Sequence, residues 1–177
     1  MKNQFRKTLI SASFTALICA GAFIKIPIGP VPVTLQTMFI IMCGLLFPLS
    51  VSFTSVLTYI LIGIIGIPVF TSGGGIAALS GPTGGYLLGL IPATILLSFF
   101  RKKNNVIIMS IGALLSQIVI YTSGLIVLGK SLNLSLPATL TAGLIPFIPG
   151  DIIKTVCAVI AAHRLREKAN SILYTEV

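Results

Sequence analysis

Acidic residues and histidine are scarce in this chain. It has three acidic residues and one histidine among 177 residues, and Asp151 is its only aspartate. The histidine, His163, lies beside Arg164 near the end of the last apolar stretch, so a hydrolase would lack the base that activates its nucleophile. Three scattered cysteines give no disulfide framework and, with so few other ligands, no metal site. The residue chemistry therefore does not support an enzyme, and we expect no cofactor.

Long hydrophilic stretches are also missing. The chain is 55% hydrophobic and 8% charged, with a mean hydropathy of +1.08, which is far from the composition of soluble domains. No linker or low-complexity segment divides it. We therefore predict an all-α integral membrane protein that forms a single membrane domain over residues 1–177.

Apolar stretches between turn and charge signals predict a bundle of six transmembrane helices. Their limits are roughly 8–26, 33–48, 50–67, 84–100, 105–128 and 140–163. Basic residues gather before the first stretch, after the fourth and after the sixth, which are all on one side. By the positive-inside rule both termini are cytoplasmic, in a multi-pass protein of the cell membrane. The net charge of +9 then reflects topology rather than binding to nucleic acid.

The most informative segment is 146–154, because it places a carboxylate and an ammonium inside an apolar stretch. Each such charge costs roughly 2.5–3.5 kcal/mol at the middle of a bilayer. Asp151 and Lys154 are three residues apart, so on a helix they share a face and can meet one bound molecule. An ion pair that only neutralises itself is the alternative. Prolines and a glycine before Asp151 predict that the helix starts or kinks there.

Polar and aromatic residues elsewhere can complete a pocket around these charges. Counted from the cytoplasmic edge, the carboxylate lies about 20 Å deep, in the outer half of the bilayer, so the pocket should open outward. Thr34 and Gln36 begin the second stretch at a similar depth. Phe70, Tyr86 and Phe147 can enclose the apolar body of a small ligand. Residues 67–83, rich in glycine and uncharged, are either a lid over the pocket or a long turn.

Small residues mark two possible helix contacts. Ala12, Ala16 and Ala20 recur every four residues in the first stretch, and Gly85 and Gly89 share that spacing in the fourth. Such spacing lets another helix approach closely. For the glycine pair we expect packing within the protein rather than dimerisation.

Two local patterns are rejected by their context. Residues 124–131 have the letters of a P-loop, but they close an apolar helix instead of following a strand. We therefore expect no ATP site in this chain.

Residues 20–22 resemble a signal-peptide cleavage site, but five further apolar stretches favour a retained first helix.

Four segments of the chain resemble the BioY family, the biotin-specific S components of energy-coupling factor (ECF) vitamin transporters. They are residues 22–27 with 31–37, then 63–70, 81–89 and 146–154. They follow the family's order and spread over nearly the whole chain. The six predicted spans equal the number in that family.

The resemblance implies that the chain captures biotin outside and delivers it inward. ATP would be hydrolysed by two separate ATP-binding subunits, joined through a scaffold membrane subunit that the family's small-residue stripe, here Ala12 and Ala16, would face. With the residue chemistry, it gives a substrate-binding set of Thr34, Gln36, Phe70, Gly84, Tyr86, Asp151 and Lys154. An S component for another small vitamin, or a membrane-embedded enzyme acting on lipid or peptide, are the alternatives.

Overall fold

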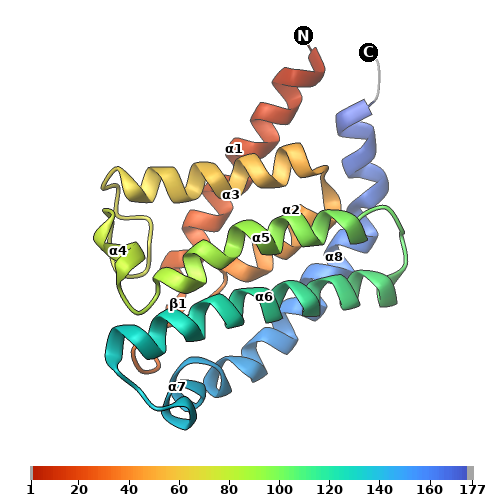
Figure 1. Ribbon diagram of the computed structural model, residues 1–177. Helices are drawn as coiled ribbons and strands as arrows, with labels where there is room; N and C mark the ends of the chain where they lie inside the picture. Colours follow the sequence, from red (N-terminus) through yellow and green to blue (C-terminus); the bar gives the residue numbers. More distant parts are fainter. Residues whose placement is uncertain (1, 175–177) are drawn as a thin grey trace.

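The computed structural model describes residues 2–174, most of which lie in helices (Figure 1). The predicted domain of 1–177 includes residue 1 and residues 175–177, which lie outside the described part. The helices are α1 (Lys2–Phe23), α2 (Gln36–Leu46), α3 (Leu49–Ile64), α4 (Ala77–Ser80), α5 (Gly84–Phe100), α6 (Val106–Leu132), α7 (Leu136–Gly143) and α8 (Ile148–Tyr174), with a 3-10 turn, η1 (Ile145–Phe147), before α8. The predicted helical class is therefore confirmed.

A two-residue antiparallel ladder joins β1 (Lys25–Ile26) to β2 (Val33–Thr34). The expectation of a helix from residue 33 onward was wrong at its start, since α2 begins only at Gln36. The ladder explains the difference, because Val33 and Thr34 are held extended by pairing with Ile26 and Lys25. The ladder places Thr34 beside the first turn of α2.

The other helix limits follow the sequence signals to different degrees. Helix α5 covers the predicted range 84–100. The predicted continuous helix over 140–163 was wrong in its limits, because η1 interrupts it and α8 starts at Ile148. That start lies within the segment where the prolines and glycine predicted one.

Helices α5 and α6 pack backbone to backbone through two glycines. A Cβ atom on Gly85 would lie 2.3 Å from the carbonyl oxygen of Ser123, and one on Gly89 would lie 2.1 Å from its hydroxyl. Neither position can therefore hold a larger side chain without moving α6. This confirms the predicted packing within the protein.

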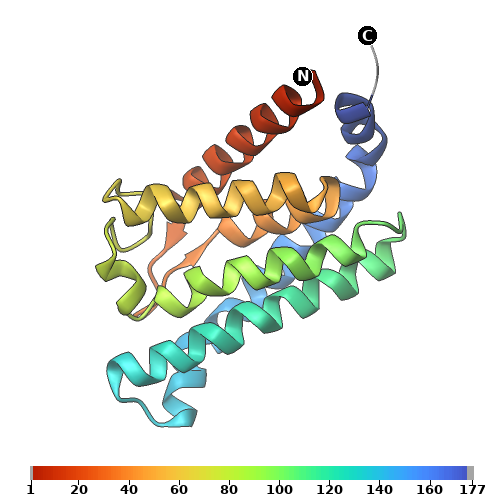
Figure 2. The same ribbon diagram turned by 45° about the horizontal axis from the view of Figure 1, so that its top comes forward.

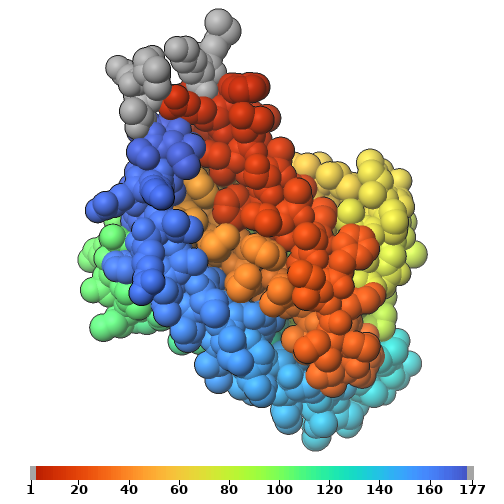
Figure 3. Space-filling model, turned by 180° about the vertical axis from the view of Figure 1, so that it is seen from behind, coloured from red at the N-terminus to blue at the C-terminus, as the bar shows by residue number. Residues whose placement is uncertain are grey.

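Helix α1 packs on α3 through one face and leaves the other uncovered. The hydroxyls of Ser11 and Thr15 donate to carbonyls of α3 at 3.2 and 3.1 Å. Ala12 and Ala16 are exposed. Figure 3 shows α1 at the surface along its length. The alanine stripe is thus free to meet another helix.

Much of the outer surface is apolar. On α6, Ile107, Leu114 and Ile118 are 70%, 54% and 59% exposed and lie on one stripe of the helix. Two helical stretches, Val106–Leu132 and Leu136–Tyr174, are long and apolar enough to cross a bilayer, and α2, α3 and α5 are shorter apolar helices. An apolar surface of this extent suits contact with lipid rather than water.

The start of α1 and the end of α8 lie at the same end of the bundle (Figures 1 and 2). A hydrogen bond of 3.3 Å from Arg6 Nη1 to the carbonyl oxygen of Ile172 joins them. The β ladder and α4 lie at the opposite end (Figure 1). The first turn of α8, which carries the predicted charges, belongs to that opposite end.

Candidate ligand-binding site

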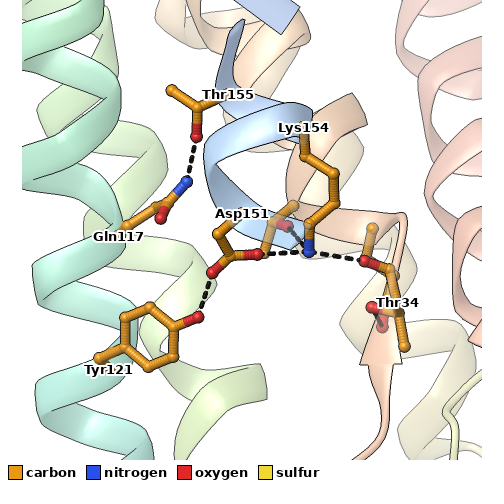
Figure 4. A network of polar contacts seen from close by, with 8 residues as sticks. Thr34, Gln117, Tyr121, Asp151, Lys154 and Thr155 are labelled. Carbon is orange, nitrogen blue, oxygen red and sulfur yellow. Dashed lines mark hydrogen bonds and ion pairs between the residues drawn. The ribbon is translucent and has the colours of Figure 1, made fainter. Parts of the chain in front are cut away.

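The two charges of the 146–154 segment form a buried ion pair. Asp151 lies in the first turn of α8, and Lys154 follows one turn later. The two side chains are each 8% exposed, and Lys154 Nζ contacts Asp151 Oδ1 (Figure 4). The spacing of three residues therefore places them on one face of the helix, as predicted.

Lys154 anchors the start of α2 to α8. Its ammonium donates to the carbonyl oxygen of Thr34 at 2.9 Å and to the hydroxyl of Thr37 at 3.2 Å, in addition to its contact with Asp151 (Figure 4). An ammonium has three donors, so all three are engaged. A bound molecule can accept from Lys154 only by replacing one of these partners.

Asp151 keeps acceptor capacity for a ligand. Its second oxygen accepts from the Tyr121 hydroxyl of α6, and one turn earlier on that helix Gln117 donates to Thr155 of α8. A carboxylate has about four lone-pair positions, and residues 2–174 make only two contacts with it. The network thus leaves acceptor sites on a carboxylate that is held from two helices.

A cavity lies beside this network, between the starts of α2 and α5, the middle of α6 and the start of α8. It contains about 620 Å³ of space between atoms, counting the part that opens to solvent. Five of the seven predicted binding residues line it, namely Thr34, Gln36, Tyr86, Asp151 and Lys154. The fold thus brings residues more than 100 positions apart to one hollow.

The other two predicted residues lie outside the cavity lining that the described residues form. Phe70 is 3% exposed, and its ring packs edge-on against Tyr59 with the ring centroids 5.4 Å apart. A Cβ atom on Gly84 would lie 1.8 Å from the carbonyl oxygen of Leu79, so this glycine lets α4 sit against α5. Both residues shape the loop around the site rather than its wall.

Thr83 lines the cavity with a hydroxyl that has no partner among residues 2–174. Its side chain is buried, with 8% of the residue exposed. A buried polar group without a hydrogen bond costs about 1–3 kcal/mol. This cost indicates a donor and acceptor that a bound molecule would satisfy. Thr83 lies in segment 81–89, one of the four that resemble the BioY family, but the sequence analysis did not predict it as a binding residue.

Three aromatic rings form a wall of the cavity. Tyr86, Tyr121 and Phe147 lie with ring centroids 6.1 to 6.3 Å apart. The Tyr86 hydroxyl donates to the carbonyl oxygen of Gly143 at 2.8 Å, which fixes its ring. The site is therefore amphipathic, with a charged network beside an aromatic surface, as is usual for small-molecule pockets.

The loop over residues 67–83 also contributes to the lining of the cavity. Thr71 lines the cavity, and its carbonyl oxygen accepts from Lys25 Nζ of β1 at 2.9 Å. Gly73 and Gly75 have φ angles of +109° and +97°, which other residues rarely adopt. The loop is thus tied to the β ladder, and its role as a lid stays a prediction.

Sequence reasoning also missed Gln117 and Tyr121. They are four residues apart on α6, so they share one face, and both are polar in an otherwise apolar stretch. That pattern is the signal that could have found them, because polar side chains within a membrane span usually face the bundle interior.

The comparisons with known proteins agree in one family. The family described as "BioY family" matches residues 1–171. A probable biotin transporter BioY from Pyrococcus horikoshii is 39% identical over 91% of this chain and 96% of its own length. Biotin transporters BioY from Lactococcus lactis and Thermotoga maritima are 37% and 35% identical, over 97% and 92% of this chain and 97% and 96% of their own lengths.

A solved structure shares the fold. The crystal structure at 2.1 Å of the S-component for biotin from an ECF-type ABC transporter has a TM-score of 0.85 and 35% identity. The match covers 93% of this chain and 92% of the other. The similarity therefore extends over nearly the whole molecule.

Proposed function

The chain belongs to the BioY family, and from that premise we propose that it is the biotin-binding S component of an ECF-type vitamin importer. Membership of a biotin transporter family also confirms the expectation of a transport subunit rather than an enzyme. The observation that supports a ligand at this site most directly is the buried ion pair, whose carboxylate has acceptor capacity toward an open cavity.

The donors and acceptors at the cavity suit the ureido ring of biotin, which has two N–H donors and one carbonyl. In the proposed complex, Asp151 accepts from the ureido N–H groups. The carbonyl accepts from the Thr83 hydroxyl or from the second amide N–H of Gln36, whose first N–H is held by Tyr59 at 2.6 Å. Hydrogen bonds to charged groups contribute about 1.5–3 kcal/mol each, so this arrangement supports tight binding.

Equilibrium binding of labelled biotin to the detergent-purified protein tests the proposal. We expect saturable binding that unlabelled biotin displaces, whereas thiamine and riboflavin in about 100-fold excess do not, because neither presents two N–H donors on either side of one carbonyl to Asp151. Displacement by either vitamin would identify an S component for another nutrient. Turnover of a lipid or peptide that survives loss of Asp151 would instead favour an enzyme.

We propose a multi-pass arrangement in which α1, α2, α3, α5, α6 and α8 cross the cell membrane as one domain. The shared end of α1 and α8 carries Arg101, Lys102 and Arg166, which favours the cytoplasmic side. Asp151 is fifteen residues before Arg166 on α8, or about 22 Å away along the helix. The cavity then lies toward the outer side, where biotin would enter.

The partners of this subunit would be a transmembrane scaffold and two ATP-binding subunits, because we assign no ATP site to the chain itself. The exposed alanine stripe of α1 is the proposed contact with the scaffold. Small residues there allow the helices to approach closely, and the other face of α1 is already occupied by α3.

Replacing Ala12 or Ala16 by tryptophan should weaken assembly with the scaffold while leaving biotin binding unchanged. The indole would hold the helices apart, whereas the cavity lies at the other end of the bundle. Co-purification with the scaffold subunit measures the effect. Leu17→Trp is the matched control, since Leu17 is also exposed on α1 but is neither three nor four residues from Ala12 or Ala16. Normal assembly of the stripe variants would show that this face is not the contact.

A further inference from the structure

A second hollow lies at the end of the bundle that carries the start of α1 and the end of α8. It is lined by Arg101, Lys102, Arg166, Asn170 and Tyr174. The first two follow α5, and the other three lie on the last turns of α8. Asp151 and the cavity beside it are about 22 Å away along α8, so the two hollows are separate.

The two arginines are held in place but keep donors to spare. Arg166 is 7% exposed and donates through Nη2 to the carbonyl oxygens of Leu45, at 2.7 Å, and of Arg101. Arg101 donates through Nε to the carbonyl oxygen of Leu46 at 3.0 Å and through Nη2 to Asn170 at 3.2 Å. A guanidinium has five N–H donors, so each arginine has about three left.

No carboxylate contacts either guanidinium among the described residues. Their partners are neutral carbonyls and an amide, and Lys102 adds a third positive charge to the same hollow. Within residues 2–174, like charges are gathered here without a counter-charge, and one of them is more than nine-tenths buried. Such a fork of free N–H groups matches an anion with several oxygens, above all a phosphate.

The surroundings of the hollow are those of a membrane interface. Phe99, at the end of α5 and three residues before Lys102, is 69% exposed. Tyr174, which lines the hollow, is 55% exposed. Apolar side chains that face lipid, next to an aromatic residue and cations, mark the level of the lipid head groups.

We propose that this basic hollow binds a phosphate-bearing anion, namely the head group of an anionic phospholipid in the membrane leaflet at the end where α1 begins. The phosphate accepts from the free N–H groups of Arg101 and Arg166 and from Lys102, while the acyl chains lie against Phe99. A bound head group would tie the turn after α5 to the end of α8. This site is independent of biotin binding.

Native mass spectrometry of the delipidated protein tests the site with two added lipids, phosphatidylglycerol and phosphatidylcholine of equal chain length. We expect the protein to retain at least about five times more phosphatidylglycerol than phosphatidylcholine, since each cation near an anionic lipid contributes about 1 kcal/mol to binding. The double variant Arg101→Gln/Lys102→Gln should lose this preference. Lys103→Gln is the matched control, because Lys103 is a neighbouring exposed lysine outside the hollow.

Three results would overturn the proposal. The first is equal retention of both lipids by the unaltered protein, and the second is an equal loss of preference in Lys103→Gln, which would show diffuse charge only. The third is displacement of phosphatidylglycerol by millimolar inorganic phosphate, which would assign the hollow to free phosphate. Circular dichroism and biotin binding verify that each variant is folded, so a failure here is distinct from a failure of the proposed function.

Discussion

Asparagine in place of Asp151 should weaken biotin binding by roughly 10- to 100-fold, which corresponds to one charge-assisted hydrogen bond. Asparagine keeps the size of the side chain and can still accept from Tyr121. It removes the negative charge that would accept from the ureido N–H groups, and it leaves Lys154 without its counter-charge. Isothermal titration of the purified variant with biotin measures the loss.

Glu167→Gln is the control for Asp151→Asn. It neutralises an exposed carboxylate on the same helix, far from the cavity, so biotin affinity should not change. The chain has no tryptophan, so circular dichroism rather than intrinsic tryptophan fluorescence must show that both variants are folded. Unchanged affinity in a folded Asp151→Asn variant would remove Asp151 from the binding site.

The charged part of the site could be predicted from sequence because charge is expensive inside an apolar segment. Asp151 and Lys154 stand out in their stretch, and their spacing alone places them on one face. The limits of α5 were equally readable, since a glycine-rich turn precedes it and basic residues follow it. These are local properties, which do not depend on how the helices are arranged.

The rest of the site depends on helix rotation and on loop packing, which local patterns do not determine. Tyr121 was visible as a polar residue in an apolar helix, but which face of α6 meets α8 is set by close contacts such as Gly89 against Ser123. Phe70 and Gly84 belong to segments beside the cavity, yet they pack against Tyr59 and α4. Membership of a segment beside the cavity therefore did not show whether a residue lines the cavity or packs behind the residues that line it.

The ladder between β1 and β2 is another feature of the site that local sequence patterns did not determine. Thr34 was predicted as a polar group of the ligand site, through its side chain. In the structure its hydroxyl donates to Gln36 at 3.0 Å, while its carbonyl oxygen holds Lys154 at 2.9 Å. A backbone group thus carries part of the role expected of a side chain, and only the extended conformation of β2 presents it to α8.

Methionine in place of Lys154 should both destabilise the protein and abolish biotin binding. It leaves Asp151 as a buried charge with Tyr121 as its only partner among the described residues. Breaking a buried ion pair by removing one member costs about 3–5 kcal/mol. It also releases Thr34 and Thr37, so the start of α2 loses its anchor on α8. Thermal unfolding followed by circular dichroism measures the first effect, and titration with biotin measures the second.

The double variant Asp151→Asn/Lys154→Met separates a structural ion pair from a binding site. Replacing both members of a buried pair by neutral groups is often close to neutral for stability, so most of the stability lost in Lys154→Met should return. Biotin binding should stay lost, because the double variant lacks the negative charge that accepts from the ureido N–H groups, and the start of α2 is still without its anchor on α8. Biotin should then raise the unfolding temperature of the unaltered protein but not that of the double variant.

The opposite result would have a definite meaning. A double variant that is stable and binds biotin within about threefold of the unaltered protein would show that the pair only neutralises itself, since a threefold change is under 1 kcal/mol. The cavity would then recognise its ligand through Thr83, Gln36 and the aromatic wall. Because each single variant leaves one charge unpaired, only the double variant can distinguish these two roles of Asp151 and Lys154.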